Sequence, residues 1–262
     1  MIGELKNMHE AMHHLDPISL EEMDAVKLMN RTDTKFVFHT SKLADILHLS
    51  RDHYRILQIG ENRDFRYNSL YFDTAGLDLY IDHHNGKRPR FKVRFREYVD
   101  TGNVFLEVKR KTNQNRTRKC RIEVGKTEME LSEKSIEYIE DNSPLQAALL
   151  EPALWTIFQR ITLVGKSSPE RITIDYELAF RNGIEDKQLP FYTICEVKRD
   201  SFSGHSAFIK TLRDLSIHPG NSSKYCLGTV LLKEHVKYNR FKDKILKIKR
   251  LENDYRSYPA TG

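Results

Sequence analysis

Basic residues recur at alternate positions in segments that otherwise have the composition of β-strands. In the clearest case, residues 90–98 (RFKVRFREY), the basic residues Arg90, Lys92, Arg94 and Arg96 alternate with Phe91, Val93 and Phe95. Because successive side chains of a strand point to opposite faces, the basic residues share one face and the apolar residues share the other. A guanidinium group stays ionised and binds phosphate oxygens through paired hydrogen bonds, so Arg94 and Arg96 indicate a site for a chain of phosphates. Taken alone, the segment could equally be a strand with one face in water.

Two further segments place a carboxylate beside an ammonium group on one strand face. They are Glu107-Val-Lys109 and Glu196-Val-Lys198. In a phosphate site, the lysine would bind oxygens and the glutamate would hold a divalent metal ion that bridges them. A single Glu-x-Lys pattern is more often a neutralising ion pair, but two copies favour the phosphate site. We therefore expect Glu107 and Glu196 to be metal ligands.

The alternation of charged and apolar residues recurs along the chain. It appears at 106–111, 119–124, 171–177 and 195–198, and Arg31, Asp33 and Lys35 share one face of an earlier segment. Such strands predict a sheet rolled around a charged interior, with helices over its apolar outside. That interior is unstable when empty, because like charges repel and desolvation of charge is unfavourable, so a polyanionic ligand is expected. Ser223 and Lys224 precede a predicted helix, where they could close one end of the channel or simply form a loop.

Hydrophobic periodicity and turn signals predict the elements that must hold these residues. Strands are expected at about 32–39, 54–59, 66–73, 89–99, 103–111, 116–124, 153–164, 170–178 and 191–199. Helices are expected at about 19–30, 40–51, 74–83, 206–215 and 228–238, and a helical pair broken at Pro144 is expected over 131–150. The predicted fold class is α+β: an antiparallel β-barrel, or tunnel, of about eight strands with a charged interior, flanked by helices outside. We expect residues 1–30 to form an N-terminal helical extension, 31–240 the tunnel domain, and 241–262 a basic helix end and tail.

Composition limits the class of protein. The chain has 262 residues, of which 31% are charged, and a net charge of +6. The best apolar stretch, 144–158, is interrupted by Glu151, so no membrane span is expected. An N-terminus without an apolar signal core and an odd number of widely spaced cysteines indicate a cytoplasmic protein. A basic C-terminal stretch that contacts the inner face of the membrane is the alternative to an ordinary solvated helix face.

Eight short motifs carry a resemblance to a known family. They are RxDxKF at 31–36, SLYFDT at 69–74, RFKVRFREY at 90–98, FLEVKRK at 105–111, FQR at 158–160, RITIDYEL at 171–178, CEVK at 195–198 and SSKYCLG at 222–228. In this order they resemble the catalytic VTC (vacuolar transporter chaperone) domain, the polyphosphate polymerase of the triphosphate tunnel metalloenzyme, or CYTH-like, superfamily. The resemblance runs from about 31 to 238 and is nearest to the bacterial stand-alone form. A membrane partner would then be a separate chain.

The resemblance implies transfer of the terminal phosphate of ATP onto a growing inorganic polyphosphate chain, with Mn²⁺ or Mg²⁺ as the cofactor. By motif, phosphate binding falls to Lys35, Arg94, Arg96, Lys109, Arg160, Lys198, Ser223 and Lys224, and metal binding to Glu196. Of these, we expect Lys35, Arg94, Arg96 and Arg160 to be catalytic. The strand pattern adds Arg31, Lys92, Lys111, Arg121 and Arg171 as substrate-binding residues and Glu107 as a second metal ligand. The expected partners are ATP, inorganic polyphosphate and a membrane protein; no nucleic acid is expected.

One departure from the superfamily pattern bears on the reaction. Many tunnel hydrolases begin with Glu-x-Glu-x-Lys, whereas this chain has Arg31 and Asp33 at the acidic positions. A hydrolase must deprotonate a water molecule, but a terminal phosphate is already anionic, so Arg31 favours polymerisation unless it is a structural variant. The alternatives are a triphosphatase of the same fold and a non-catalytic binder of polyphosphate or RNA. Against RNA, the aromatic residues Phe91, Phe95 and Tyr98 are expected on the face opposite the basic residues.

Overall fold

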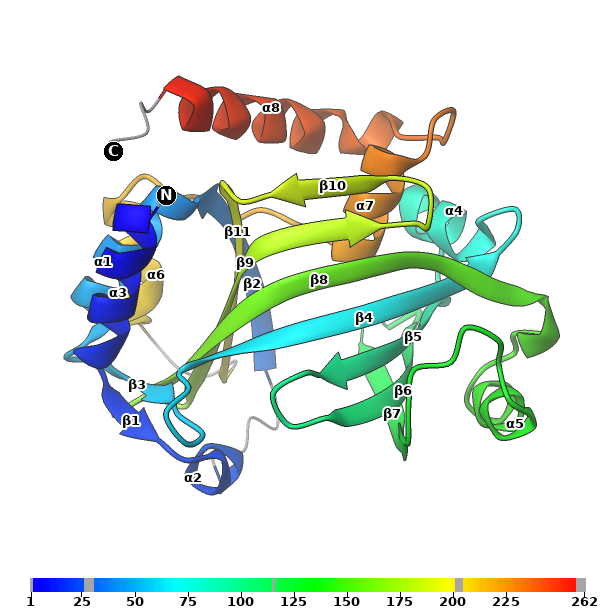
Figure 1. Cartoon of the computed structure of the whole chain (residues 1–262), viewed down its shortest axis with the longest axis horizontal. Helices are drawn as coiled ribbons and strands as arrows, with labels where there is room; N and C mark the ends of the chain where they lie inside the picture. The colour runs from blue at the N-terminus through cyan, green and yellow to red at the C-terminus, as the bar shows by residue number, and fades with distance from the viewer. Residues whose placement is uncertain (1, 26–30, 115, 201–204, 258–262) are drawn as a thin grey trace.

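The computed structural model describes residues 2–25, 31–114, 116–200 and 205–257 (Figure 1). One large sheet forms the body of the molecule. Its strands are β1 Asp16–Ile18, β2 Arg31–His39, β3 Tyr54–Leu57, β4 Asp64–Thr74, β5 Arg90–Tyr98, β6 Asn103–Lys111, β7 Thr117–Val124, β8 Leu150–Gly165, β9 Glu170–Arg181, β10 Asp186–Leu189 and β11 Tyr192–Asp200. The main path follows the order β2-β11-β9-β8-β4-β5-β6-β7, and every pair along it is antiparallel.

Helices lie around this sheet (Figure 1). They are α1 Ile2–His13, α2 Leu20–Ala25, α3 Leu43–Ser50, α4 Asp78–Asn85, α5 Glu133–Asn142, α6 Ala207–Asp214, α7 Lys224–Leu232 and α8 Lys242–Ser257, with short 3₁₀ turns at Thr40–Lys42, Ala147–Leu149 and Asn239–Phe241. The predicted α+β class, with a large antiparallel sheet flanked by helices, is confirmed. No helix within the described ranges is both long and apolar enough to cross a membrane.

The sheet is not a closed barrel. Its end strands, β2 and β7, are not paired with each other in the described part of the chain. Most of β7 is exposed, and basic residues such as Arg118 and Lys119 lie along it. Charged side chains on an edge strand disfavour pairing with a further strand, which accounts for the open edge. The main path nevertheless contains eight of the nine predicted strand segments, and the ninth, at 54–59, is β3, which pairs with β8 beside this path.

Many apolar side chains of the strands lie on the outer face, as predicted, but those beneath α7 lie on the concave face. Val93, Phe95 and Leu106 pack with Ile139 of α5 in one buried cluster. A second outer cluster joins residues of β2, β8, β9 and β11 to helices α1, α3 and α6 through Met12, Ile46 and Phe208, among others. Because the residues of these two clusters point outward from the strands of the main path, the residues that alternate with them, many of which are charged, point to the concave face.

Helix α7 lies on part of the concave face, which is apolar there. Leu154, Leu178 and Phe180 of β8 and β9 pack with Tyr225 and other residues of α7. A methyl group at Gly228 would lie 2.5 Å from Phe180 Cδ1 and 2.6 Å from Leu154 Cδ2. The contact between α7 and the sheet therefore depends on the absence of a side chain at this position.

Three predicted helical regions differ in their bounds. The pair predicted over 131–150 forms only α5 and the 3₁₀ turn Ala147–Leu149, and Leu150 begins β8. The Ser19–Glu22 capping box forms, with Glu22 N donating to Ser19 Oγ and Ser19 N donating to Glu22 Oε2. Helix α2 ends at Ala25, and the rest of the predicted helix, 26–30, lies outside the described residues. Helix α7 begins at Lys224 rather than 228, because the Ser223 hydroxyl accepts from Cys226 N and caps the helix.

Candidate functional site

Three carboxylates on the concave face are each held between two basic side chains. Glu107 accepts from Arg94 Nη2 at 2.5 Å and from Lys119 Nζ at 2.9 Å, and its side chain is only 1% exposed. Burial alone would raise the pKa of Glu107, but Arg94, Arg96 and Lys119 hold it well below its usual value. Glu107 is therefore a fixed anion that positions two cations.

Asp175 of β9 makes the second group of this kind. It accepts from Arg160 Nε at 2.5 Å and Nη2 at 2.8 Å, and also from Lys224 Nζ. Burial opposes ionisation of Asp175, but the two cations lower its pKa strongly. Burial also lowers the pKa of Lys224 to about 8, despite the neighbouring carboxylate. Asp175 thus holds Arg160 of β8 and Lys224 of α7 next to each other.

Glu196 of β11 makes the third group. Lys35 Nζ donates to its Oε1 at 2.7 Å, and Lys198 Nζ donates to its Oε2 at 2.8 Å. The pairing of β11 with β2 places Lys35 opposite Glu196, which explains why the predicted Glu-x-Lys pattern gains a second lysine. In contrast to Glu107, the Glu196 side chain keeps 21% of its surface exposed.

Three more cations on this face have no carboxylate partner among the described residues. Arg96 donates to Ser69 Oγ at 3.2 Å, and Lys92 donates to Ser223 Oγ at 2.8 Å. Lys109 is opposite Lys92 on β5 and opposite Lys119 on β7, so three lysines form a row across three strands. Desolvation on the concave face, followed by the charges of Lys92 and Arg94, lowers the pKa of Lys109 to about 7, although part of the Lys109 side chain reaches solvent. Such a row is unfavourable without an anion.

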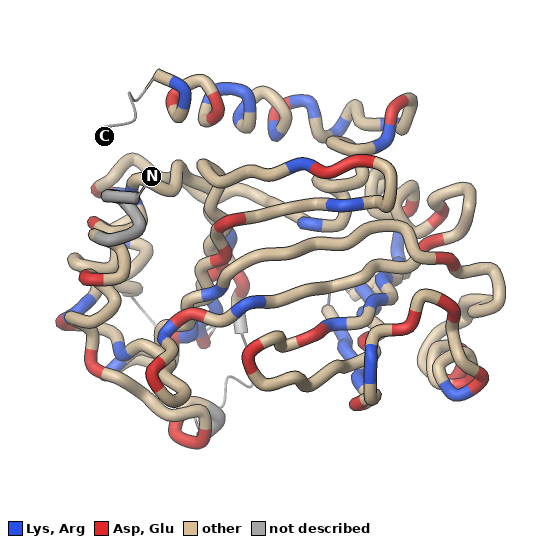
Figure 2. Tube along the Cα trace, viewed as in Figure 1, with Lys and Arg blue, Asp and Glu red and all other residues tan. Residues whose placement is uncertain are grey.

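The two ends of the sheet face one another across the concave side. The charges of Lys35 on β2 and Glu196 on β11 act on Lys109 of β6, at the other end of the strand order. Asp33 and Lys35 act in the same way on Lys111. The basic residues of β2, β5, β6 and β11 therefore converge on one space, although the strands do not close around it by hydrogen bonds. Figure 2 shows basic and acidic positions interspersed along these strands.

The remaining predicted site residues take several places. Arg171 donates to the carbonyl of Met23 at 2.7 Å. Arg121 of β7 is exposed and places its guanidinium carbon 4.5 Å from the centre of the Phe105 ring. The backbone of Arg31 pairs with Asp200, but its side chain lies outside the described part of the structure.

Sequence reasoning missed four residues that the structure places at the site. They are Ser69, Tyr71, Lys119 and Asp175. The Tyr71 hydroxyl accepts from Arg94 Nη1 at 2.7 Å. Burial opposes ionisation of Tyr71, but Arg94 and Lys92 lower its pKa overall. The alternation that indicated Arg171 also contains Asp175, so strand parity was a usable signal for Asp175. Ser69 and Tyr71 belong to the SLYFDT motif, but they lie on a strand with little charge, so the alternation of charges did not indicate them.

One expectation about the aromatic residues was wrong. Tyr98 has the same parity as Arg94 and Arg96, and its ring lies 4.9 Å from that of Tyr67 on the concave face. Only Phe91 and Phe95 lie on the outer face, where both are buried. The basic face therefore carries aromatic rings as well as charges.

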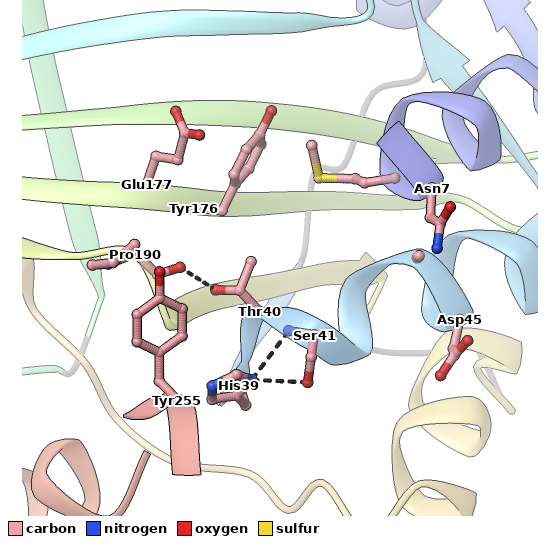
Figure 3. A pocket seen from close by; sticks show the side chains of 11 residues that line it. Asn7, His39, Thr40, Ser41, Asp45, Tyr176, Glu177, Pro190 and Tyr255 are labelled. Carbon is pink, nitrogen blue, oxygen red and sulfur yellow. Dashed lines mark hydrogen bonds between the residues drawn. The ribbon is translucent and has the colours of Figure 1, made fainter. Parts of the chain in front are cut away.

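A separate pocket lies away from these residues. Its cavity of about 150 Å³ is lined by residues including His39, Asp45, Tyr176, Glu177 and Tyr255 (Figure 3). Glu177 has a φ of 49°, in the left-handed region that an ordinary side chain rarely adopts. No predicted site residue lines this pocket.

Several solved structures show distant similarity to this chain. A candidate adenylate cyclase from Vibrio parahaemolyticus is 11% identical, with a TM-score of 0.46 over 76% of this chain and 99% of its own. A candidate adenylate cyclase from Bacillus halodurans is 13% identical, with a TM-score of 0.45 over 82% and 100%. A Hippeastrum protein described as having a dominant triphosphatase activity is 13% identical, with a TM-score of 0.43 over 77% and 96%.

A search of curated proteins by sequence gives no match. The family model of the VTC domain, in contrast, matches residues 30–233, a range that contains β2 to β11 and α7 and includes all three carboxylate groups with their cations. Because this match spans most of the chain, the protein belongs to the VTC domain family.

Proposed function

We propose that this protein is a polyphosphate polymerase, which transfers the γ-phosphate of ATP onto a growing inorganic polyphosphate chain. The observation that carries the proposal is the excess of cations on the concave face. Three carboxylates are each matched by two basic side chains, while Lys92, Lys109 and Arg96 have no carboxylate partner in the described residues. A chain of phosphates supplies the missing negative charge at short, regular spacing.

In phosphoryl transfer, the carboxylates would orient the basic side chains, and the basic side chains would bind the phosphates. Glu107 and Asp175 hold Arg94 and Arg160 in place, so these guanidinium groups are oriented before the substrate enters. Preorganised donors of this kind stabilise the charge that develops on the transferred phosphoryl group. Lys35 and Lys198 can exchange Glu196 for phosphate oxygens. No general base is required, because the terminal phosphate of the acceptor is already anionic.

A metal ion fits the site at Glu196 better than at Glu107. No group of three or more His, Cys, Asp or Glu side chains able to hold a metal occurs in the described ranges. Mg²⁺ is commonly held by one or two carboxylates together with substrate phosphates, and the partly exposed Glu196 suits this role. Both carboxylates already accept from two basic side chains, but Glu107 is only 1% exposed and a metal ion bound to substrate phosphates could not reach it. A bound Mn²⁺ or Mg²⁺ would neutralise charge on the phosphates.

The nearest alternative is a triphosphatase of the same fold. That reaction needs a carboxylate to orient and deprotonate water. The carboxylates of Glu107, Asp175 and Glu196 are each engaged by two cations, which lower the pKa of each and make it a poor base. This arrangement favours polymerisation over hydrolysis.

The proposal extends to the surroundings of the site. We place the protein in the cytoplasm and give it a separate membrane protein as a partner. The division into 1–30, 31–240 and 241–262 stays a prediction. Helix α8 buries Ile248 against the rest of the fold, and Lys247 donates to the carbonyl of Val37 at 2.8 Å, so one face of this helix is already occupied.

The experiment is ATP-dependent synthesis of polyphosphate by variants of the site. Arg96→Ala and the double variant of Arg94 and Arg96 to Ala should lose synthesis in the presence of Mn²⁺ or Mg²⁺. Arg213→Ala, which changes an exposed arginine of α6, a helix that packs against the outer face through Phe208 and Leu212, is the matched control and should retain it. Synthesis that survives the loss of both Arg94 and Arg96 would overturn the proposal.

A further inference from the structure

Four aromatic rings form a continuous row across four neighbouring strands on the basic face. Phe158 of β8 stacks on Tyr67 of β4 with ring centres 5.3 Å apart, and Tyr67 lies 4.9 Å from Tyr98 of β5. Tyr98 lies 5.6 Å from Phe105 of β6, edge to face. The row therefore crosses the concave face beside the cations.

The two ends of the row differ in environment. At the Phe158 and Tyr67 end the rings are buried, and the guanidinium of Arg96 lies 5.5 Å from the centre of the Tyr67 ring. At the other end Tyr98 and Phe105 are only half-buried. The row thus begins at a cation that is available for phosphate and ends where water reaches the rings.

The outer core does not account for the half-buried rings. Val104 and Leu106, the neighbours of Phe105 in the sequence, supply the buried outer face of β6. The aromatic residues lie on the opposite, charged face, where a bare phosphate chain makes no use of them because the face of a ring repels an anion. A ligand that matches both features carries phosphates at one end and a flat ring at the other.

We propose that Tyr98, Phe105 and Arg121 form a subsite for the base of a nucleoside triphosphate whose phosphates contact Arg96 and Arg160. This inference rests on the proposed function and adds the direction in which the nucleotide binds. Bases stack on aromatic rings and on guanidinium planes, and Arg121 already lies 4.5 Å from the centre of the Phe105 ring. Stacking tolerates any base, so the subsite favours nucleotides over inorganic triphosphate without strong selection among them.

The orientation of the phosphates follows from the strand. Going away from Tyr98 along β5, the residues on the concave face are Arg96, Arg94 and Lys92 in turn. From Arg96 to Lys92 the strand spans about 13 Å. The base lies at the Tyr98 end, and the phosphate tail points toward Lys92 and the lysine row.

Equilibrium binding to the whole chain tests the subsite directly. The wild-type protein should bind ATP more tightly than ribose 5-triphosphate, which keeps the sugar and the phosphates but lacks the base. Tyr98→Leu and Phe105→Leu, which keep apolar volume but remove the ring, should weaken ATP binding by about tenfold while leaving inorganic triphosphate unchanged. Tyr98→Phe, which keeps the ring, should behave as wild type.

The outcomes separate this inference from the proposed function. If the wild-type protein binds ATP and ribose 5-triphosphate equally, the base has no subsite and the inference is overturned, even where a leucine variant fails to fold. Equal loss of ATP and inorganic triphosphate in a folded leucine variant would also contradict it. If the wild-type protein binds none of the three phosphates, the proposed function itself fails.

Discussion

Lys92 and Lys109 are directly opposite each other on adjacent strands, on a face where Lys92 has only a serine hydroxyl as a hydrogen-bond partner and Lys109 has no ion-pair partner among the described residues. Like charges in this position destabilise a sheet. The pKa of Lys109 is lowered to about 7, so part of the Lys109 population is neutral near physiological pH, and this reduces the repulsion between the two lysines. An anion between the two lysines would restore the proton.

Lys109 predicts opposite pH dependences for ligand affinity and for stability. Between pH 6 and 8 the empty site loses the Lys109 charge, so affinity for inorganic triphosphate should fall, by at most about tenfold per pH unit from this group. Lys109→Gln should remove the part of the pH dependence that comes from Lys109. The dependence that remains in the variant includes protonation of the ligand, so the comparison of the two proteins cancels it. Identical pH profiles for wild type and variant, measured by titration calorimetry, would contradict the role of Lys109.

The stability of the empty protein should change in the other direction. The folded pKa of Lys109 lies below the ordinary value of about 10.4, so between about pH 7 and pH 10 the unfolded chain binds more protons than the folded chain. The contribution of Lys109 to the free energy of unfolding therefore becomes more favourable as pH rises through this window. Urea unfolding of wild type and Lys109→Gln at several pH values measures the difference in the free energy of unfolding. If Lys109 titrates normally, this difference should not change with pH across the window.

Glu107→Gln should be strongly destabilising. The carboxylate is almost completely buried, and its loss leaves Arg94 and Lys119 without a counter-charge. Removal of one member of a buried ion pair typically costs about 3–5 kcal/mol. Added inorganic triphosphate should recover part of this loss in a urea titration. Glu196→Gln is the comparison, and the more exposed carboxylate there should give a smaller effect.

Gly228→Ala should destabilise the contact between α7 and the sheet. The added methyl group would meet Phe180 and Leu154 closer than real contacts allow, and overpacking of this kind typically costs about 1–3 kcal/mol. Gly125→Ala is the matched control, because a side chain there meets nothing within 4 Å. Thermal unfolding should separate the two variants, and equal melting temperatures would show that α7 is not packed as described.

Tyr71→Phe should lower activity and also lower stability, because it removes a hydrogen bond to a charged group at a buried position. The Tyr71 hydroxyl holds one nitrogen of Arg94, while Glu107 holds the others, so the variant leaves the guanidinium in place but less fixed. Hydrogen bonds to charged groups contribute about 1.5–3 kcal/mol, so a fall in kcat of about tenfold or more is expected. A change in KM for ATP alone, without a change in kcat, would argue against a positioning role in the transition state.

The sequence was informative where chemistry follows strand parity. Arg94, Arg96, Lys109 and Lys198 could be placed on one face because alternation has a period of two, and the structure puts them there. The same alternation places Asp175 and Tyr98 on this face, but an acidic residue among basic residues and an aromatic residue at the end of a strand are weak signals of a phosphate site. In both cases the pattern was sufficient and the chemical expectation was too narrow.

Other features could not be predicted from local pattern. The partner of Glu196 from β2, Lys35, depends on the pairing of strands about 160 residues apart in sequence. The position of α7 on the concave face depends on packing at Gly228, which a helical periodicity does not reveal. The open edge between β2 and β7 depends on the balance of charges along an edge strand rather than on the strand pattern itself.

The central claim is that the converging cations align ATP with a phosphate acceptor rather than with water. Incubation of the purified protein with ATP labelled at the γ-phosphate, in the presence of Mn²⁺, followed by separation of products by length, tests this most directly. The account predicts labelled chains that grow with time and that a polyphosphatase degrades. Release of labelled orthophosphate alone, with no chain longer than the starting triphosphate, would contradict it.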